Sequence, residues 1–239
     1  MIASFSCRFI FLKTRKTAGT SVELALSSAC GPEDIVTPIS LEDEHLRVRD
    51  GLVGARNFAG AEVVESYRTA VLTRNADLHR AAMQRAKSEG FFNHMPAAKV
   101  APKLPPDFWR SAFKFSIVRH PYERAVSSAY FRMHQHGAPV GDFPKWLDRV
   151  CDNQGFDDAK IYSIDGEVVV DDMIRFESLE DDLRRICSRL SVDLPDRIPR
   201  AKSTMRLDRR PAREVLSDRQ KEKLFERCRD TFLAFGYEA

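Results

Sequence analysis

The chain has 239 residues, of which 43% are hydrophobic, and its formal net charge is +3 at pH 7. This length and apolar content can bury one sizeable core, so the sequence predicts a single domain over residues 1–239. Such a small net charge does not indicate a nucleic-acid-binding protein, because those proteins present a concentrated basic surface.

Cysteine spacing and the lack of a long apolar run set the expected environment of the chain. No C-x-x-C pair and no Cys/His cluster with metal-ligand spacing is present, so we expect reduced structural thiols and no metal. The amino-terminal segment has no basic stretch followed by a long apolar run. No segment approaches the roughly 18 apolar residues that a membrane span needs. We therefore expect a cytoplasmic protein without a membrane span. The cysteines are Cys7, Cys30, Cys151, Cys187 and Cys228.

The first strong element is an apolar strand, Arg8 to Leu12, that runs into a helix from Thr17 to Ala29. A turn of small and hydroxyl-bearing residues joins the two. Amide hydrogens and hydroxyls in such a turn can surround a phosphate group at a helix N-terminus. The candidate phosphate-binding residues are Lys16, Thr17, Ala18, Gly19, Thr20 and Ser21.

The middle of the chain carries less signal. Glu33 to Gly60 is charged and contains glycine, which indicates a variable, loop-like insertion. Val63 to Leu72 fits either a strand or a short helix, and the pattern does not separate the two. Asn75 to Lys87 predicts a polar amphipathic helix, and a proline-rich connector runs from Pro96 to Pro106.

A second apolar strand, Phe113 to Val118, leads through Arg119 into a helix from Tyr122 to His136. Pro121 fits the first turn of that helix, where its missing N–H costs nothing. The planar guanidinium of Arg119 matches a phosphate group. Ser127, about two turns into the helix, can add a hydroxyl on the same side. Two anion sites at two strand ends indicate a doubly phosphorylated nucleotide.

Strands and helices continue to alternate toward the C-terminus. Val168 to Val170 and Met173 to Phe176 are expected strands, and Ser178 with Asp181 resembles a capping pair that opens another helix. Ser217 to Gln220 has the pattern of a capping box. This alternation predicts an α/β fold, in which a parallel sheet is flanked by helices and ligands gather at the carboxyl ends of the strands.

The two phosphate motifs together carry a resemblance to a known family. Lys16-Thr-Ala-Gly-Thr-Ser21 and Arg119-x-Pro-x-x-Arg-x-x-Ser127 resemble the 5′-phosphosulfate loop and the 3′-phosphate motif of sulfotransferases that use 3′-phosphoadenosine 5′-phosphosulfate (PAPS). The chain is most similar to the carbohydrate branch, which has Golgi-type and bacterial members. Phe92-Asn-His94, Asp165 to Glu180 and Phe235-Gly-Tyr237 extend the resemblance over nearly the whole chain. Two motifs in the correct order are specific, whereas one alone would be weak.

The resemblance implies the sulfotransferase fold, with a P-loop-like sheet, and transfer of a sulfuryl group from PAPS to an acceptor hydroxyl, on a carbohydrate or glycoconjugate. Lys16 would contact the 5′-phosphate and stabilise the negative charge that builds on the departing bridge oxygen. Arg119 and Ser127 would bind the 3′-phosphate, together with Lys202 and Ser203, which fall where relatives have a loop that closes on the nucleotide. No metal would be needed. We expect a bacterial, cytoplasmic member of the family.

An acceptor hydroxyl needs a general base near its proton, and His94 is the candidate. Its position before the second motif resembles that of the base in carbohydrate sulfotransferases. A lone histidine is more often a structural hydrogen-bonding group, and that alternative stays open. Glu123, Glu62 or Glu65 could serve instead, and the sequence does not rank them. Lys13 stands where relatives often have histidine.

Two other functions stay open from the sequence. A P-loop nucleotide kinase or hydrolase shares the strand–loop–helix geometry, although G-x-x-x-x-G-K-[ST] is absent and no metal-binding aspartate ends a later apolar strand. A non-catalytic nucleotide- or glycan-binding protein would keep the Arg119 site but tolerate loss of His94.

Overall fold

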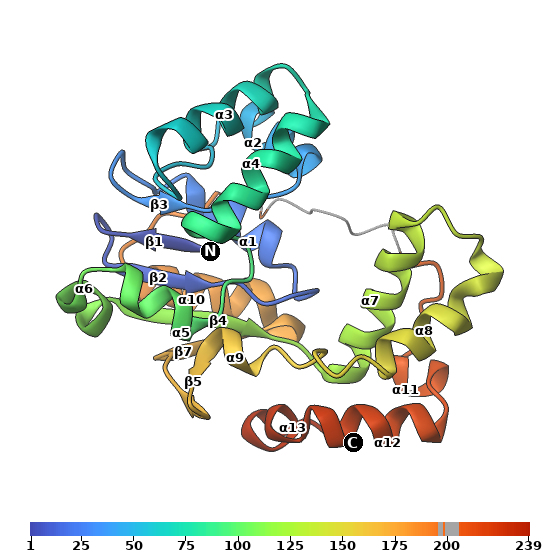
Figure 1. Cartoon of the computed structure of the whole chain (residues 1–239). Helices are drawn as coiled ribbons and strands as arrows, with labels where there is room; N and C mark the ends of the chain where they lie inside the picture. Colours follow the sequence, from blue (N-terminus) through green and yellow to red (C-terminus); the bar gives the residue numbers. More distant parts are fainter. Residues whose placement is uncertain (196–197, 199–205) are drawn as a thin grey trace. The chain divides into compact units, whose positions relative to one another are not determined.

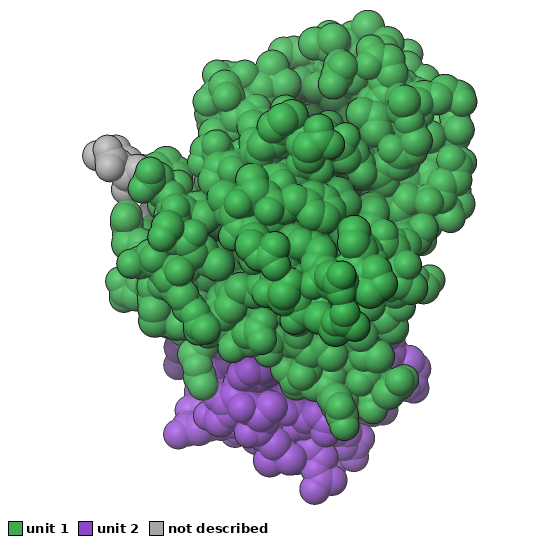
Figure 2. Space-filling view, turned by 90° about the vertical axis from the view of Figure 1, so that its left-hand side faces the viewer, with its two compact units in different colours: residues 1–117, 160–201 green, residues 118–159, 202–239 purple. Residues whose placement is uncertain are grey.

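The computed structural model describes residues 1–195, 198 and 206–239. The chain divides into two compact units, one of residues 1–117 and 160–201 and one of residues 118–159 and 202–239 (Figure 2). The first unit contains the sheet, whereas the second is built from helices. Each unit has apolar core clusters of its own.

A five-stranded sheet in the order β3-β1-β2-β4-β7 lies at the centre of the first unit (Figure 1). β2 and β4 pair in parallel, whereas β1 is antiparallel to both β2 and β3. β3, β2 and β4 therefore run in one direction and β1 runs against them. The predicted α/β class, with a mostly parallel sheet flanked by helices, is confirmed. The strands are β1 (Ile2–Ser4), β2 (Phe9–Leu12), β3 (Ile35–Val36), β4 (Phe113–Val118) and β7 (Asp172–Arg175).

Helices cover the sheet, and a small two-stranded sheet of β5 and β6 accompanies it. The helices α3 and α4 lie side by side, as Figure 1 shows. These elements are α1 (Gly19–Ser27), α2 (Leu41–Arg49), α3 (Ala61–Leu72), α4 (Ala76–Glu89), α5 (Ala97–Val100), α6 (Pro106–Ser111), α9 (Ala159–Tyr162), α10 (Leu179–Arg189), β5 (Ser163–Ile164), β6 (Glu167–Val168) and the 3₁₀ turns Ala101–Lys103 and Phe176–Ser178.

The alternation of side chains along β2 divides the first unit into two cores. Phe9 and Phe11 belong to a cluster that includes buried residues of α1 and α10. Ile10 and Leu12 belong to another cluster, with buried residues of α3 and α4. All four side chains are fully buried. The sheet is therefore covered on both faces, as an α/β architecture requires.

The expected loop from Glu33 to Gly60 is wrong, because this segment contains β3 and α2. Ser40 caps α2, since its Oγ accepts a hydrogen bond from the Asp43 N–H at 3.3 Å. The helix buries the charged residues Asp43, Glu44 and Arg47 rather than an apolar stripe. Hydrophobic periodicity therefore could not reveal it. The neighbouring ambiguous segment is helix α3.

Helices build the second unit around one apolar cluster. Pro121 opens α7 as predicted, and the His120 Nδ1 accepts a hydrogen bond from the Tyr122 N–H at 3.2 Å. The predicted capping box is confirmed at α12, where Ser217 and Gln220 bond reciprocally. The helices are α7 (Pro121–Gln135), α8 (Phe143–Cys151), α11 (Ala212–Val215), α12 (Asp218–Arg227) and α13 (Arg229–Phe235), with a 3₁₀ turn at Val140–Asp142.

None of the helices in the described part of the chain is both long and apolar enough to cross a bilayer. All five cysteine thiols are free of disulfide bonds, and four of them are buried.

Candidate active site

A loop leaves the sheet at the carboxyl end of β2, beside the end of β4. Leu12 lies opposite Ser116 in the parallel pair, and the Ser116 Oγ donates a hydrogen bond to the Leu12 carbonyl at 2.6 Å. The Thr14 hydroxyl donates to the carbonyl of Ile117. The loop is therefore attached to both parallel strands at the edge where α/β proteins bind ligands.

The loop backbone turns through two residues in the left-handed region. Lys16 and Ala18 both have φ of 60°. Thr14 and Thr17 hold the turn together, because their hydroxyl oxygens lie 2.9 Å apart and the Thr17 Oγ1 also donates to the Thr14 carbonyl at 3.3 Å. Left-handed residues next to a helix N-terminus are typical of backbone concavities that bind anions.

Helix α1 begins directly after this turn, at Gly19. A Cβ atom at Gly19 would lie 2.6 Å from Cγ of Lys13 and 3.2 Å from its Cε. Only glycine therefore lets the Lys13 side chain pass over the start of the helix. Thr17 and Ser21 are buried, whereas Lys16 and Thr20 are half-buried. The predicted phosphate-binding residues thus form one compact loop and first helical turn.

His94 lies against this loop although it is 81 residues away from Lys13 in the sequence. Its Nδ1 is 3.0 Å from the carbonyl oxygen of Lys13. Because a carbonyl can only accept, Nδ1 carries the proton of the neutral ring and Nε2 carries the lone pair. This is the tautomer in which Nε2 can accept a proton, so the predicted base and the predicted phosphate loop are neighbours.

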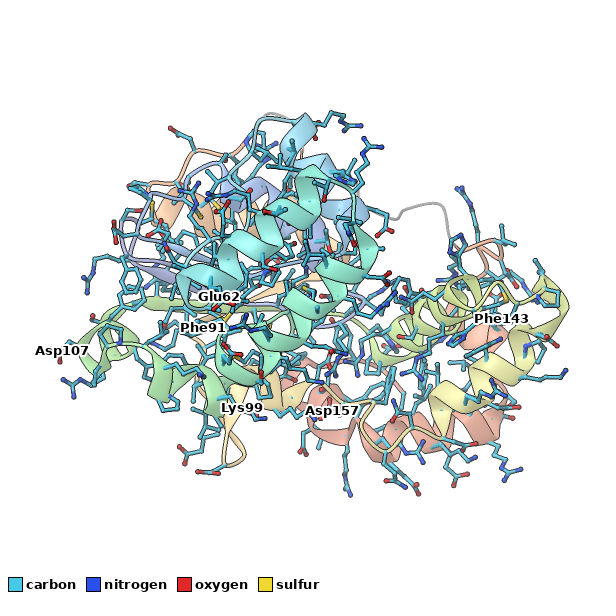
Figure 3. The ribbon with its side chains drawn as sticks, turned by 45° about the horizontal axis from the view of Figure 1, so that its top comes forward. Glu62, Phe91, Lys99, Asp107, Phe143 and Asp157 are labelled. Atoms are coloured by element: carbon cyan, nitrogen blue, oxygen red, sulfur yellow. The ribbon has the colours of Figure 1, made fainter. Side chains whose placement is uncertain are left out.

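The segment before His94 is fixed by a close backbone contact. The Phe91 N–H donates to the Phe58 carbonyl at 2.6 Å. Phe91, labelled in Figure 3, comes directly after the end of α4. At Gly90, a Cβ atom would lie only 2.0 Å from the same carbonyl oxygen, so this position needs glycine. The backbone of His94 itself is left-handed, with φ of 60°. The Gly90–His94 segment therefore has little freedom to move away from the loop.

Burial and, secondly, the nearby Lys13 ammonium lower the pKa of His94 to about 3, although part of the side chain reaches the surface. Smaller contributions in the same direction come from the Met1 amino group and Arg15. Each of these positive groups disfavours a second positive charge on the ring. His94 is therefore neutral, and able to accept a proton, throughout the neutral pH range.

The sequence interpretation gave Lys13 no role, yet Lys13 contacts both helix α1 and His94. Its side chain is only 2% exposed, and its Nζ lies 2.6 Å from Oε2 of the fully buried Glu23 on α1. Its carbonyl holds His94, as described above. A lysine that follows an apolar strand, with a glutamate ten residues later on an apolar helix, was the only sequence signal for this pair.

Arg119 and Ser127 belong to the second unit. Arg119 follows Val118, the last residue of β4, and its side chain is 11% exposed with Nη2 3.5 Å from Oε2 of Glu123. Ser127 is half-buried on the second turn of α7. Glu123 also pairs with Arg206 and accepts a hydrogen bond from the Ala212 N–H at 2.7 Å.

The three glutamates considered as alternative bases are held by positive groups. Burial alone would raise the pKa of Glu123. Hydrogen bonds from Ala212 and Arg206, with the nearby Arg119, outweigh this effect, so the pKa lies below its usual value. Glu62 (labelled in Figure 3) and Glu65 lie on the exposed side of α3. They are 2.8 Å from Arg85 and 3.0 Å from Arg68, respectively. All three carboxylates are thus already engaged by arginine side chains.

Lys202 and Ser203, predicted to contact the 3′-phosphate, lie outside the described residues. Within the described residues, no group of three or more His, Cys, Asp or Glu side chains is arranged to hold a metal ion.

Comparison with known proteins gives one result for the whole chain. A family model described as the sulfotransferase family matches residues 1–238. No curated protein sequence and no solved structure matches the chain.

Proposed function

Because the chain belongs to the sulfotransferase family, we propose that its donor is PAPS and that its acceptor is a hydroxyl group of a carbohydrate or glycoconjugate. Membership of the family makes the protein a transferase of sulfuryl groups. The donor, the acceptor class and the residue roles below belong to the proposal.

The observation that carries the proposal is the hydrogen bond from His94 to the Lys13 carbonyl. It brings a neutral imidazole with its lone pair on Nε2 to the loop that contains Lys16. A base and an anion-binding loop are the two groups that sulfuryl transfer to a hydroxyl requires, because one proton must leave the acceptor while negative charge builds on the donor.

In the proposed reaction, the acceptor hydroxyl gives its proton to His94 Nε2 while its oxygen forms a bond to sulfur. The bond between sulfur and the bridging oxygen breaks, and its electron pair stays on the 5′-phosphate of the nucleotide product. Lys16 stabilises the negative charge on that oxygen. The proton on His94 then passes to solvent, which returns the ring to its starting state.

A pKa of about 3 keeps His94 in the base form but also makes its ring a weak proton acceptor. An anionic donor bound at the loop would counter this, because negative charge near the imidazolium raises its pKa. His94 would therefore become a better base when the nucleotide is present. This order of events suits a transferase that must bind donor and acceptor together.

Arg119 and Ser127, together with Lys202 and Ser203, are proposed to bind the 3′-phosphate. The guanidinium of Arg119 offers paired N–H groups for two phosphate oxygens, and the Ser127 hydroxyl adds a further donor.

Calorimetric titration without metal tests the donor. The protein would be titrated with 3′-phosphoadenosine 5′-phosphate (PAP), adenosine 5′-phosphate and ATP. Binding that requires the 3′-phosphate supports the proposal, whereas preference for ATP with magnesium would replace it with a kinase or hydrolase. Formation of a sulfated product from PAPS and a panel of saccharides then separates the enzyme from a non-catalytic binding protein.

A further inference from the structure

Lys13 makes three contacts that involve three different parts of the first unit. Its Nζ lies 2.6 Å from Glu23 on α1. Its carbonyl oxygen accepts the hydrogen bond of His94. Its aliphatic stem passes over Gly19, where a Cβ atom would lie 2.6 Å from Cγ of Lys13. The last residue before the loop is therefore fixed through both its side chain and its backbone.

Glu23 is the partner that holds the Lys13 side chain in place. It is fully buried on α1, and its Oε1 also lies 2.9 Å from the Met1 amino group and 3.7 Å from Nη2 of Arg47. Burial raises the pKa of Glu23, but the positive groups around it, Lys13 foremost, bring the pKa well below its ordinary value. Burial lowers the pKa of Lys13, and Glu23 is the main group that counters this. Removing either member of such a buried pair is costly, because the other is left without compensation.

We propose that Lys13 is a positioning residue for sulfuryl transfer: its ion pair with Glu23 fixes its backbone, so that its carbonyl holds His94 as the Nδ1–H tautomer beside the phosphosulfate loop. This role for Lys13 rests on the proposed function in one respect, that His94 is the base. It makes the buried pair a part of the reaction machinery rather than solely a stabilising feature of the fold.

The fixed tautomer matters because the other tautomer cannot act as a base at Nε2. With the proton on Nε2, that atom would have no lone pair for the acceptor proton. A backbone carbonyl enforces the productive form only while it keeps its distance and direction to the ring. The Lys13–Glu23 pair and the close packing over Gly19 keep the carbonyl at a fixed distance and direction from the ring.

A matched pair of substitutions tests the proposal. Lys13→Met keeps the stem over Gly19 and removes the ammonium. Arg47→Met removes a positive charge from the same buried cluster but leaves Lys13, whose carbonyl holds His94, unchanged. Both variants lose one positive partner of Glu23. Arg47→Met also removes the partner of Glu44, so it should lose at least as much stability as Lys13→Met. The two variants differ in their connection to His94. Thermal unfolding and circular dichroism establish that each variant is folded.

Nitrogen-15 NMR of the histidine side chains gives a readout that does not depend on activity, with His94 assigned from the His94→Gln variant. We expect the Nδ1–H signature in the wild type and in Arg47→Met. In Lys13→Met we expect a mixture of tautomers and a higher His94 pKa. The same spectra for Lys13→Met and the wild type, or equal changes in both variants, would overturn the proposal.

Kinetics give the second readout, once a saccharide acceptor is found. Lys13→Met should lower kcat by about tenfold to a hundredfold, as expected for a misplaced catalytic group. Its affinity for PAP should stay within about threefold of the wild type, because the loop residues that bind the nucleotide are retained. Equal losses in kcat and PAP affinity would mean that Lys13 only supports the loop.

A further variant covers the case in which Lys13→Met does not fold. Glu23→Gln keeps the Lys13 side chain but removes the negative charge that counters the lowering of the Lys13 pKa by burial. It should therefore weaken the pair and also mix the His94 tautomers. An unchanged Nδ1–H signature in Glu23→Gln would count against the ion pair as the fixing element. Full activity of His94→Ala would instead remove His94 as the base while leaving the NMR test of positioning intact.

Discussion

Three single side chains carry the proposed chemistry, and each lies in a different environment. Lys16 lies half-buried in a loop with left-handed backbone, whereas His94 is held neutral by burial and by positive neighbours. Arg119 is largely buried beside Glu123. These differences lead to separate expectations for substitution, pH and nucleotide selectivity.

Lys16→Ala should reduce kcat by roughly 10²- to 10³-fold, because a positive group that stabilises the developing charge is lost. Its effect on PAP affinity should be much smaller. Lys99→Ala is the matched control, since Lys99 is an exposed lysine on α5 in the same unit (Figure 3). Steady-state kinetics and PAP titration measure the two effects. A similar loss in both would assign Lys16 to ground-state binding alone.

Arg119→Ala should reduce the preference for PAP over adenosine 5′-phosphate by at least about tenfold, because a charge-assisted contact to the 3′-phosphate would be lost. Affinity for adenosine 5′-phosphate should hardly change. Arg149→Ala, an exposed arginine on α8 of the same unit, serves as control. Titrations with both nucleotides give the ratio, and an unchanged ratio would remove Arg119 from the 3′-phosphate site.

His94 should make the free energy of unfolding depend on pH below neutrality. Its pKa is about 3 in the folded protein and about 6.5 when unfolded, so between these values the unfolded chain binds a proton that the folded chain does not. Stability therefore falls as the pH drops from about 6.5 toward 3. His94→Gln should lose less stability than the wild type between pH 7 and about 4.5 in urea titrations. Parallel curves for the two proteins would contradict the lowered pKa.

The elements that position the site differ in how well the sequence predicts them. The β4 strand and helix α7 were predicted almost to the residue, because an apolar run stops at Arg119 and Pro121 fits the first turn of a helix. The phosphate loop was equally visible, since its residues are consecutive. Helix α2 was missed because it buries charges, including Arg47, which pairs with Glu23 on α1. The contact between His94 and Lys13 likewise depends on tertiary structure that periodicity does not report.

The start of α1 should tolerate no side chain at Gly19. In Gly19→Ala the new methyl group would press on the stem of Lys13, which is itself held by Glu23, so that the loop or the helix must shift. We expect a loss of about 1–3 kcal/mol in the free energy of unfolding, and weaker PAP binding. Gly60→Ala is the control, because a Cβ there meets no atom within 4 Å. Urea unfolding and PAP titration distinguish the two variants.

For the whole molecule, the prediction of one domain can be tested because each unit contains one tryptophan. Trp109 belongs to the first unit and Trp146 to the second, and the chain has no others. Trp109→Phe and Trp146→Phe variants should unfold in urea with the same midpoint, as a single cooperative domain does. PAP should raise both midpoints together. Two separate midpoints, or a PAP effect on one alone, would show that the units unfold independently.

The order in which the sheet is assembled has a consequence for synthesis of the chain. Phe9, Phe11 and Phe115 lie in the core cluster that α10 helps to cover, yet α10 ends only at Arg189. While the ribosome adds the residues between β4 and α10, this aromatic face lacks part of its cover. Exposed apolar surface of this kind promotes aggregation of nascent chains. Many residues separate β4 from the helix that covers it. We therefore expect the nascent chain to need chaperone binding most after β4 has emerged.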